Sequence, residues 1–368
     1  MRKKISFAGP SITQKEINYV MDGVKNGFYE TFDQHIIKLE KAVASYLGRK
    51  YALATHTGTL ALHLSNESIG LKEDDEVICT DFSWVATAYS IVYTGAKPVF
   101  VDIDPDTWCI DPVRIREAIT KRTKAIMLVH SFGIPADMDE IMAIAKEHNL
   151  KVIEDACPAL GAEYKGKKAG SFGDAGCFSF HGAKIAVSGE GGMMTTDDEE
   201  VYEKARLLAV MGRTDSQAVF WSDYVGYQYT IANLTASLAL SQVERIEELV
   251  AIKRKIFGWY EERLENIEGI KLIREKPDTR ANYCYPSILL EDSIGADRDA
   301  TVKKLKEYNI HCRPAFPRMS RFPTLEQRYE NPVAAIVEKR GISLPSAANL
   351  DENDIDFVCE MLRKLIIP

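Results

Sequence analysis

Short apolar runs alternate with stretches of helical period between residues 76 and 196. The runs are EVICT (76–80), KPVFVDID (97–104), KAIMLVH (124–130), KVIEDA (151–156), GCFSF (176–180) and GGMMTT (191–196). Between them lie amphipathic segments such as MDEIMAIAKEHNL at 138–150. Runs that are apolar on both faces and separated by helices are typical of a mainly parallel sheet covered by helices on both sides. The pattern therefore predicts an α/β protein.

The pattern changes after Thr196, where helical period dominates. The elements expected there are a long amphipathic helix at 233–264, a strand at 281–290, a helix at 296–310 and a closing helix near 352–365. Such an order predicts a second, smaller α+β domain that is hinged on the long helix. We place the large domain, with an N-terminal arm, at 1–245 and the small domain at 246–368.

Composition narrows the possible functions. The chain has 368 residues, of which 46% are hydrophobic and 27% charged, as in an ordinary folded protein. Its 46 basic and 54 acidic residues give a net charge of −8, which disfavours nucleic acid as the main partner. The seven scattered cysteines form no CxxC pair, so we expect reduced thiols and no zinc site. Because the first residues lack an apolar core and no long apolar window follows, we expect a cytoplasmic protein with no membrane association.

The most informative stretch runs from residue 154 to residue 198. One predicted strand delivers Glu154 and Asp155 at its carboxyl end, and a second ends in Ser179 and His181, with Lys184 just beyond. A carboxylate and a lysine at neighbouring strand ends suit pyridoxal phosphate, which needs an amine for a Schiff base and an acid for its pyridine nitrogen. Each residue alone also fits a helix cap or a surface position. A dinucleotide site is disfavoured because SGEGGM leads into a strand, not a helix.

A phosphate site is predicted in the N-terminal third. YALATHTGTLALHL at 51–64 indicates a strand, a tight turn at Thr57 and Gly58, and a helix from Thr59. Unpaired N–H groups at a helix start bind anions, although an ordinary capped helix would give the same pattern. Trp84 follows another strand and could stack on a planar ring or belong to the core.

Taken together, the motifs resemble those of the DegT/DnrJ/EryC1/StrS family of pyridoxal-phosphate-dependent sugar aminotransferases, from about residue 5 to the C-terminus. The matching blocks are TGTLALHL, EVICTDFSWVATA, GAKPVFVDIDPDTWCIDP, TKAIMLVHSFGIPADMDEI, the segment 152–198, YNIHCRP and RGISLPSAANL. The resemblance implies fold type I, with a mainly parallel seven-stranded sheet in the large domain. Within the family the chain looks most like the GDP-perosamine synthase type, which aminates nucleotide-linked 4-keto-6-deoxysugars.

The resemblance also implies a role for each matching residue. Lys184 would form the Schiff base and move the proton, while Asp155 would pair with the pyridine nitrogen. Trp84 would stack on the ring. The phosphate ligands would be Thr57, Gly58, Thr59 and Ser179, together with Gln228 from the partner subunit of a homodimer. A dehydrating member would carry histidine in place of Lys184, so amino transfer is the simplest interpretation.

Several positions depart from the family pattern. Pro158 stands where a polar residue usually approaches the cofactor's phenolic oxygen. Gln228 replaces the usual Asn, and Thr230 replaces a usual Arg. Met319 stands near the place of a frequent His, in a loop that keeps Arg313. These departures leave the identity of the sugar less certain than the chemistry.

The resulting hypothesis is transfer of an amino group from L-glutamate to a nucleotide-linked ketosugar, in amino-sugar biosynthesis for a surface glycan such as the O-antigen of lipopolysaccharide. Arg313, Arg318 and Arg321 are candidates for the nucleotide's diphosphate, and His181 for the substrate; the arginines could equally be surface residues. Two alternatives remain open. One is another pyridoxal phosphate reaction, namely ketosugar dehydration or amination of a keto-inositol or keto acid-sugar. The other is a catalytically silent regulatory or binding protein.

Overall fold

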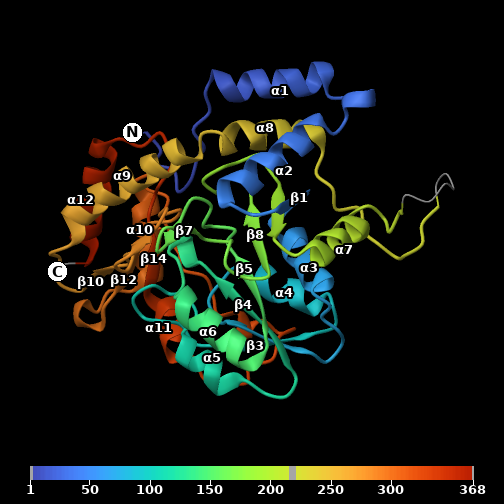
Figure 1. The fold of residues 1–368 in the computed structure, drawn as a ribbon. Helices are drawn as coiled ribbons and strands as arrows, with labels where there is room; N and C mark the ends of the chain where they lie inside the picture. The colour runs from blue at the N-terminus through green and yellow to red at the C-terminus, as the bar shows by residue number, and fades with distance from the viewer. Residues whose placement is uncertain (1–2, 215–220, 367–368) are drawn as a thin grey trace.

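A seven-stranded sheet lies at the centre of the computed structural model, which describes residues 3–214 and 221–366 (Figure 1). Its order is β1-β9-β8-β5-β4-β2-β3. The strands are β1 (Tyr51–Thr55), β2 (Glu76–Thr80), β3 (Lys97–Val101), β4 (Thr123–Val129), β5 (Lys151–Asp155), β8 (Ala175–Ser179) and β9 (Gly192–Thr196). Only β9 pairs antiparallel with its neighbours, β1 and β8. The predicted mainly parallel sheet is confirmed.

Helices cover both faces of this sheet. On one face lie α3 (Gly58–Ser68), α4 (Ala86–Val92) and α7 (Glu199–Ala209), which bury residues such as Leu62 and Ile91 against the strands. On the other lie α5 (Pro112–Ala118) and α6 (Met138–His148), with Ile115 and Ile141 in the core. Both faces of the strands are therefore buried, which explains the continuous apolar runs in the sequence.

Three further helices pack together beside the sheet and lead into a fourth. They are α1 (Gln14–Asn26), α2 (Gln34–Leu47) and α8 (Asn233–Val243), followed by α9 (Ile246–Leu264) (Figure 1). The single helix predicted at 233–264 is wrong, because the chain turns between α8 and α9. Arg245 at this turn donates hydrogen bonds to the buried Glu16 carboxylate (2.6 Å) and to the Ser11 carbonyl (3.3 Å). Gln242 of α8 donates to the same carboxylate at 2.8 Å, so residues on both sides of the turn hold Glu16.

A second, antiparallel sheet lies in the C-terminal part, in the order β10-β12-β14-β13. Its elements are β10 (Ile270–Leu272), β12 (Ser287–Leu290), β13 (Arg313–Pro314) and β14 (Gly341–Ser343), with helices α10 (Arg298–Glu307), α11 (Pro332–Arg340) and α12 (Glu352–Ile366). The strand predicted at 281–290 is shorter than expected. Asn282 donates instead to the carbonyls of Pro158 and Leu160, both at 2.9 Å, which ties this segment to the large sheet's loops.

Short elements complete the fold. A small sheet joins β11 (Thr279–Arg280), β6 (Glu163–Tyr164) and β7 (Lys167–Lys168), and 3₁₀ turns lie at Tyr29–Thr31, Ser131–Gly133, Asp292–Ile294 and Met319–Arg321. The N-terminal segment crosses to the C-terminal part, where Ile5 pairs with Ile310 and the Phe7 carbonyl accepts from the Ser346 N–H. The domain limits 1–245 and 246–368 remain a prediction. Within the described residues, no helix combines the length and the apolar character needed to span a bilayer.

One partly buried carboxyl group on α2 makes stability depend on pH. Burial raises the pKa of Glu40 from 4.5 to about 7, although the Ala54 N–H donates to it at 2.9 Å. Because the pKa is higher in the folded state, the contribution of Glu40 to stability is fully present below pH 4.5. This contribution is lost as the pH rises through about 7.

We therefore expect Glu40→Gln, which keeps the acceptor oxygen, to be more stable than the natural protein at pH 8. The expected gain is about 1 to 3 kcal/mol, and it should vanish near pH 4.5. Denaturant unfolding at several pH values measures this difference. The exposed Glu30→Gln serves as the control. A gain of equal size at pH 4.5 and pH 8 would contradict the explanation.

Candidate active site

A cavity of about 490 Å³ opens where the carboxyl ends of the parallel strands meet. Thr57 follows β1, Trp84 follows β2 and Ser131 follows β4, while Asp155 ends β5 and Ser179 ends β8; all five line the cavity. Strand direction alone brings these distant segments to one edge of the sheet. The structure thus gathers most of the sequence-predicted residues, including Lys184, at one place.

The start of α3 forms one wall of the cavity. The Thr57 hydroxyl caps this helix by accepting from the Leu60 N–H at 3.2 Å. A Cβ atom on Gly58 would lie 2.9 Å from both the Cys157 Sγ and the Ser179 Cβ. Only glycine therefore allows the helix start to approach the end of β8 this closely. We call this close approach at the start of α3 the Gly58 cradle. The Gly58 and Thr59 N–H groups lie in the first turn, where an α-helix lacks intrahelical partners for its amides.

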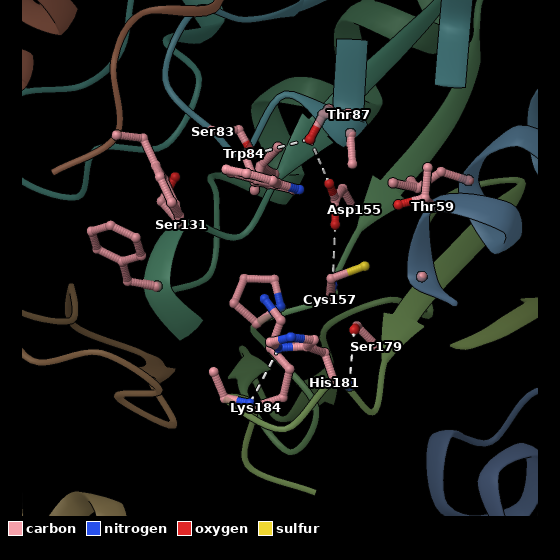
Figure 2. Close-up of a pocket in the computed structure, with 18 of the residues that line it drawn as sticks. Thr59, Ser83, Trp84, Thr87, Ser131, Asp155, Cys157, Ser179, His181 and Lys184 are labelled. Atoms are coloured by element: carbon pink, nitrogen blue, oxygen red, sulfur yellow. Dashed lines mark hydrogen bonds between the residues drawn. The ribbon is translucent and has the colours of Figure 1, made fainter. Parts of the chain in front are cut away.

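Two hydrogen bonds hold the Asp155 carboxylate in place at the cavity. Its Oδ2 accepts from the Thr87 hydroxyl at 2.7 Å, and its Oδ1 accepts from the Cys157 N–H at 3.2 Å (Figure 2). The Ser83 hydroxyl lies 3.0 Å from that of Thr87. Each carboxylate oxygen keeps a further lone pair for a ligand in the cavity. These contacts fix both the position and the orientation of the carboxylate.

Glu154 does not join the cavity, although it precedes Asp155 on the same strand. Successive strand residues face opposite sides of a sheet. Glu154 is fully buried on the far side, where it accepts from the N–H groups of Gly170, Phe172 and Gly173 at 2.6–2.7 Å, and lies 3.0 Å from the His130 ring. Burial opposes its charge, but the His130 contact and these amides lower the pKa of Glu154 below its usual value. Its role is to anchor the loop at 170–173.

Lys184 lies at the cavity wall across from Trp84 in the view of Figure 2. Its Nζ is 5.7 Å from the centre of the Tyr285 ring. Burial alone would lower the pKa of Lys184. Nearby acidic groups outweigh burial and raise this pKa above its ordinary value; they are Tyr285, Cys284, Cys157 and Asp155. The amine is therefore charged at neutral pH in the chain alone, and a ligand that consumes or displaces that charge would change its state.

Flat apolar groups line the rest of the cavity. Trp84 is 62% exposed, and its ring lies 6.1 Å from that of Phe316. A large exposed aromatic ring at a cavity is available to stack on a planar ligand. Pro158 also lines the cavity, and its ring offers no hydrogen-bond donor there.

The three candidate arginines separate in the structure. Arg313 lines the cavity, and its guanidinium lies 4.7 Å from the centre of the Phe7 ring. Arg318 and Arg321 instead pair with Glu338, at 3.2 and 2.6 Å. Arg318 as a substrate ligand stays a prediction, since it would have to leave this carboxylate. No carboxylate of the described residues forms an ion pair with Arg313.

The remaining predicted residues lie at the cavity mouth or outside it. His181 lines the cavity, is exposed, and accepts from the Ala183 N–H at 3.2 Å through its Nδ1. Gln228 is exposed, does not line the cavity, and donates to the Thr230 hydroxyl at 3.0 Å. A role for Gln228 in this site would therefore need the site of another subunit. Among residues 3–214 and 221–366, no acidic, Cys or His cluster could hold a metal ion.

Thr87 and Tyr285 are among the cavity residues that sequence reasoning missed. Thr87 lies one helical turn after Trp84, a spacing that could have suggested a shared face. Tyr285 comes from a segment expected to be a strand, and no local signal pointed to the cavity. Both touch residues that the sequence did indicate, namely Asp155 and Lys184.

The residues present fit pyridoxal phosphate. The Gly58 cradle, which any Cβ would fill, offers amides for a phosphate group, and Asp155 offers oriented oxygens for a ring nitrogen. Lys184 supplies a primary amine, and Trp84 a flat surface. An ordinary capped helix would need none of the other three groups.

Comparisons with known proteins agree with this chemistry. The model of the DegT/DnrJ/EryC1/StrS aminotransferase family matches residues 10–363. A GDP-perosamine synthase from Caulobacter vibrioides is 38% identical, over 99% of both chains. Spr1654 from Streptococcus pneumoniae, solved in its PLP form, has a TM-score of 0.92 at 25% identity, over 99% of this chain and 98% of that chain. DesI, solved in the presence of its TDP-sugar product, has a TM-score of 0.91 at 28% identity, over 99% and 93%.

Proposed function

Because the chain belongs to the DegT/DnrJ/EryC1/StrS aminotransferase family, and is a pyridoxal-phosphate-dependent sugar aminotransferase of fold type I, we propose a specific reaction for it. It transfers the amino group of L-glutamate to a nucleotide-linked 4-keto-6-deoxyhexose, for the synthesis of a surface glycan such as an O-antigen. The observation that carries this proposal is the convergence of Lys184, Asp155 and the Gly58 cradle in one cavity. The similarity to a GDP-perosamine synthase supports the choice of sugar.

Each of the residues gathered at the cavity has a distinct task in this reaction. When bound, the cofactor supplies an electron sink for the negative charge left on the substrate carbon. The Lys184 Nζ would take the proton from that carbon and pass it to the cofactor, acting as general base and then general acid. Asp155, oriented by Thr87, holds the proton on the ring nitrogen. The amides of Gly58 and Thr59 and the Ser179 hydroxyl bind the phosphate.

A substrate panel tests the proposed reaction. Purified protein loaded with pyridoxal phosphate is incubated with L-glutamate and GDP-, TDP- or UDP-linked 4-ketosugars, and 2-oxoglutarate and the amino sugar are measured by mass spectrometry. We expect loss of the cofactor's visible absorbance with glutamate alone, and an amino sugar when a 4-ketosugar is added. A product that has lost a hydroxyl group and gained no nitrogen would overturn the proposal.

The working unit in this proposal is a homodimer with sites at its interface. Several large apolar side chains near the N-terminal helices are exposed, namely Phe28 (59%), Tyr29 (87%) and Phe32 (63%). An apolar surface of this kind favours burial against another chain. Gln228 is exposed and does not line its own cavity, and we assign it to the phosphate of the partner's site.

Light scattering gives the mass of the active species. Gln228→Ala is expected to weaken cofactor affinity about tenfold without changing this mass. A fully active monomer would contradict the shared site.

Arg313 is the cation of this chain that we assign to the nucleotide's diphosphate. Arg313→Gln should raise KM for the nucleotide sugar about tenfold or more and change kcat less, because the guanidinium binds a group remote from the reacting carbon. Arg321→Gln is the matched control, since Arg321 is exposed and pairs with Glu338 outside the cavity. Steady-state kinetics with varied sugar measure both. Equal effects of the two substitutions would remove Arg313 from the substrate site.

A further inference from the structure

A buried lysine on α9 takes no part in the reaction described above. Lys253 is 4% exposed, and no carboxylate of the described residues forms an ion pair with it. Its Nζ donates to the Ser346 carbonyl at 2.5 Å and to the Ser346 hydroxyl at 3.0 Å, and it contacts the Cys284 carbonyl at 3.5 Å. An unpaired buried charge is costly, and a leucine or methionine would fill the same space at lower cost. The cost of burying the Lys253 amine indicates that it has a role beyond packing.

The partners of Lys253 belong to two segments that are far apart in the sequence. Cys284 precedes Tyr285, in the stretch that leads into β12. Ser346 follows β14, and its N–H donates to the Phe7 carbonyl at 2.8 Å, which attaches the N-terminal segment. The Ser346 hydroxyl also reaches the Cys284 carbonyl at 3.2 Å. Lys253 thus joins α9 to both segments at one buried point.

The first of these segments carries Tyr285 to the active-site cavity, and the N-terminal segment held by Ser346 supports it through Phe7. The Tyr285 ring lies 5.7 Å from the Lys184 Nζ and stacks on the Phe7 ring at 5.1 Å. Phe7 in turn faces the Arg313 guanidinium at 4.7 Å. The contacts form a continuous path from Lys253 through the backbone at Cys284 to the reacting amine, with a branch to Arg313.

Both amines also act electrostatically on the same thiol. The positive charges of Lys184 and Lys253 both act to lower the pKa of the Cys284 thiol, against the effect of burial. The other groups that act electrostatically on Lys184 are Tyr285, Cys157 and Asp155. Burial lowers the pKa of Lys253 to about 8, partly opposed by the Cys284 thiol. Lys253 is therefore mainly protonated at neutral pH.

We propose that Lys253 is a positioning residue for Lys184. It clamps the Cys284–Tyr285 backbone against Ser346, which holds the Tyr285 ring beside the reacting amine. It also places a positive charge near that amine, which favours release of the proton that Lys184 carries. The inference rests on the cofactor chemistry of the family and not on the identity of the sugar or the amino donor.

A spectroscopic titration of the cofactor-loaded enzyme tests this proposal without any substrate. The visible absorbance of the chromophore that the cofactor forms with Lys184 is followed against pH in the natural protein and in Lys253→Met. The loss of the positive charge should raise the midpoint of this titration by about half a pH unit or more. Turnover of Lys253→Met should fall about tenfold in kcat, with a smaller change in KM.

Lys255→Met is the matched control, since Lys255 is exposed two residues along the same helix and loses the same charge. Its titration midpoint and kcat should stay at the natural values. Ser346→Ala keeps the charge of Lys253 but removes one of its acceptors, so we expect a severalfold lower kcat with an unchanged midpoint. It also serves if Lys253→Met does not fold. A natural midpoint in Lys253→Met, or a natural kcat in Ser346→Ala, would overturn the proposal.

Discussion

Lys184→Ala is expected to lower the rate of amino transfer at least about a thousandfold, because the chain then has no amine to move the proton at the substrate carbon. In the structure, Lys184 lies at the wall of the cavity that also contains Asp155 and the Gly58 cradle, where no other lysine lines the described site. The variant should still fold, because the side chain donates none of the hydrogen bonds that hold the cavity together. Stopped-flow absorbance after mixing with glutamate measures the half-reaction directly.

Chemical rescue sharpens this experiment. A small primary amine such as methylamine fits the space left by the Lys184 side chain and should restore part of the rate in proportion to its concentration. Lys97→Ala is the control, since Lys97 is exposed and pairs with Asp74 at the opposite edge of the sheet. Turnover by Lys184→Ala close to the natural rate would refute the assignment of the catalytic amine.

Asp155→Asn is expected to reduce kcat about a hundredfold or more, while leaving the cavity's shape intact. The amide oxygen of asparagine can accept the Thr87 hydrogen bond, but a neutral amide cannot stabilise a positive charge on a ring nitrogen. We therefore expect retained cofactor binding, slow amino transfer and an altered visible spectrum. Steady-state rates, together with the spectrum of the loaded protein, measure both effects.

Two companion variants separate charge from geometry at this position. Thr87→Val removes one donor to Asp155 and should reduce kcat about tenfold, because the carboxylate keeps its charge but loses part of its orientation. Asp174→Asn removes a carboxylate near the other end of β5, where it pairs with Lys151, and should leave kcat unchanged. If Asp155→Asn and Asp174→Asn gave equal rates, the role of Asp155 would be excluded.

The order of the large sheet's elements and its chemistry were readable from local patterns. EVICT predicted β2 to the residue, and the turn at Thr57 and Gly58 predicted the start of α3 to within one residue. These features are local, because strand length, helix period and a glycine at a close approach all leave traces within a few positions. The seven-stranded sheet and the family resemblance are both confirmed.

Elements that depend on distant partners were predicted less well. At the break between α8 and α9, Arg245 pairs with Glu16, more than 200 residues away. The late start of the strand predicted at 281–290 follows from the Asn282 contacts with the loop after β5. Periodicity carries no information about such partners. The helix was therefore predicted too long, and the start of the strand was predicted too early.

The sequence by itself determined the fold class and the family, and it proposed the residues for chemistry, because local patterns and motif order carry this information. Only the tertiary structure decided which of these residues meet. It turned Asp155 into the cavity and Glu154 away from it, and it separated Arg313 from Arg318 through the Glu338 carboxylate. It also placed Thr87 and Tyr285 at the cavity. The physical reason is that burial, strand facing and charge pairing act between segments far apart in the chain.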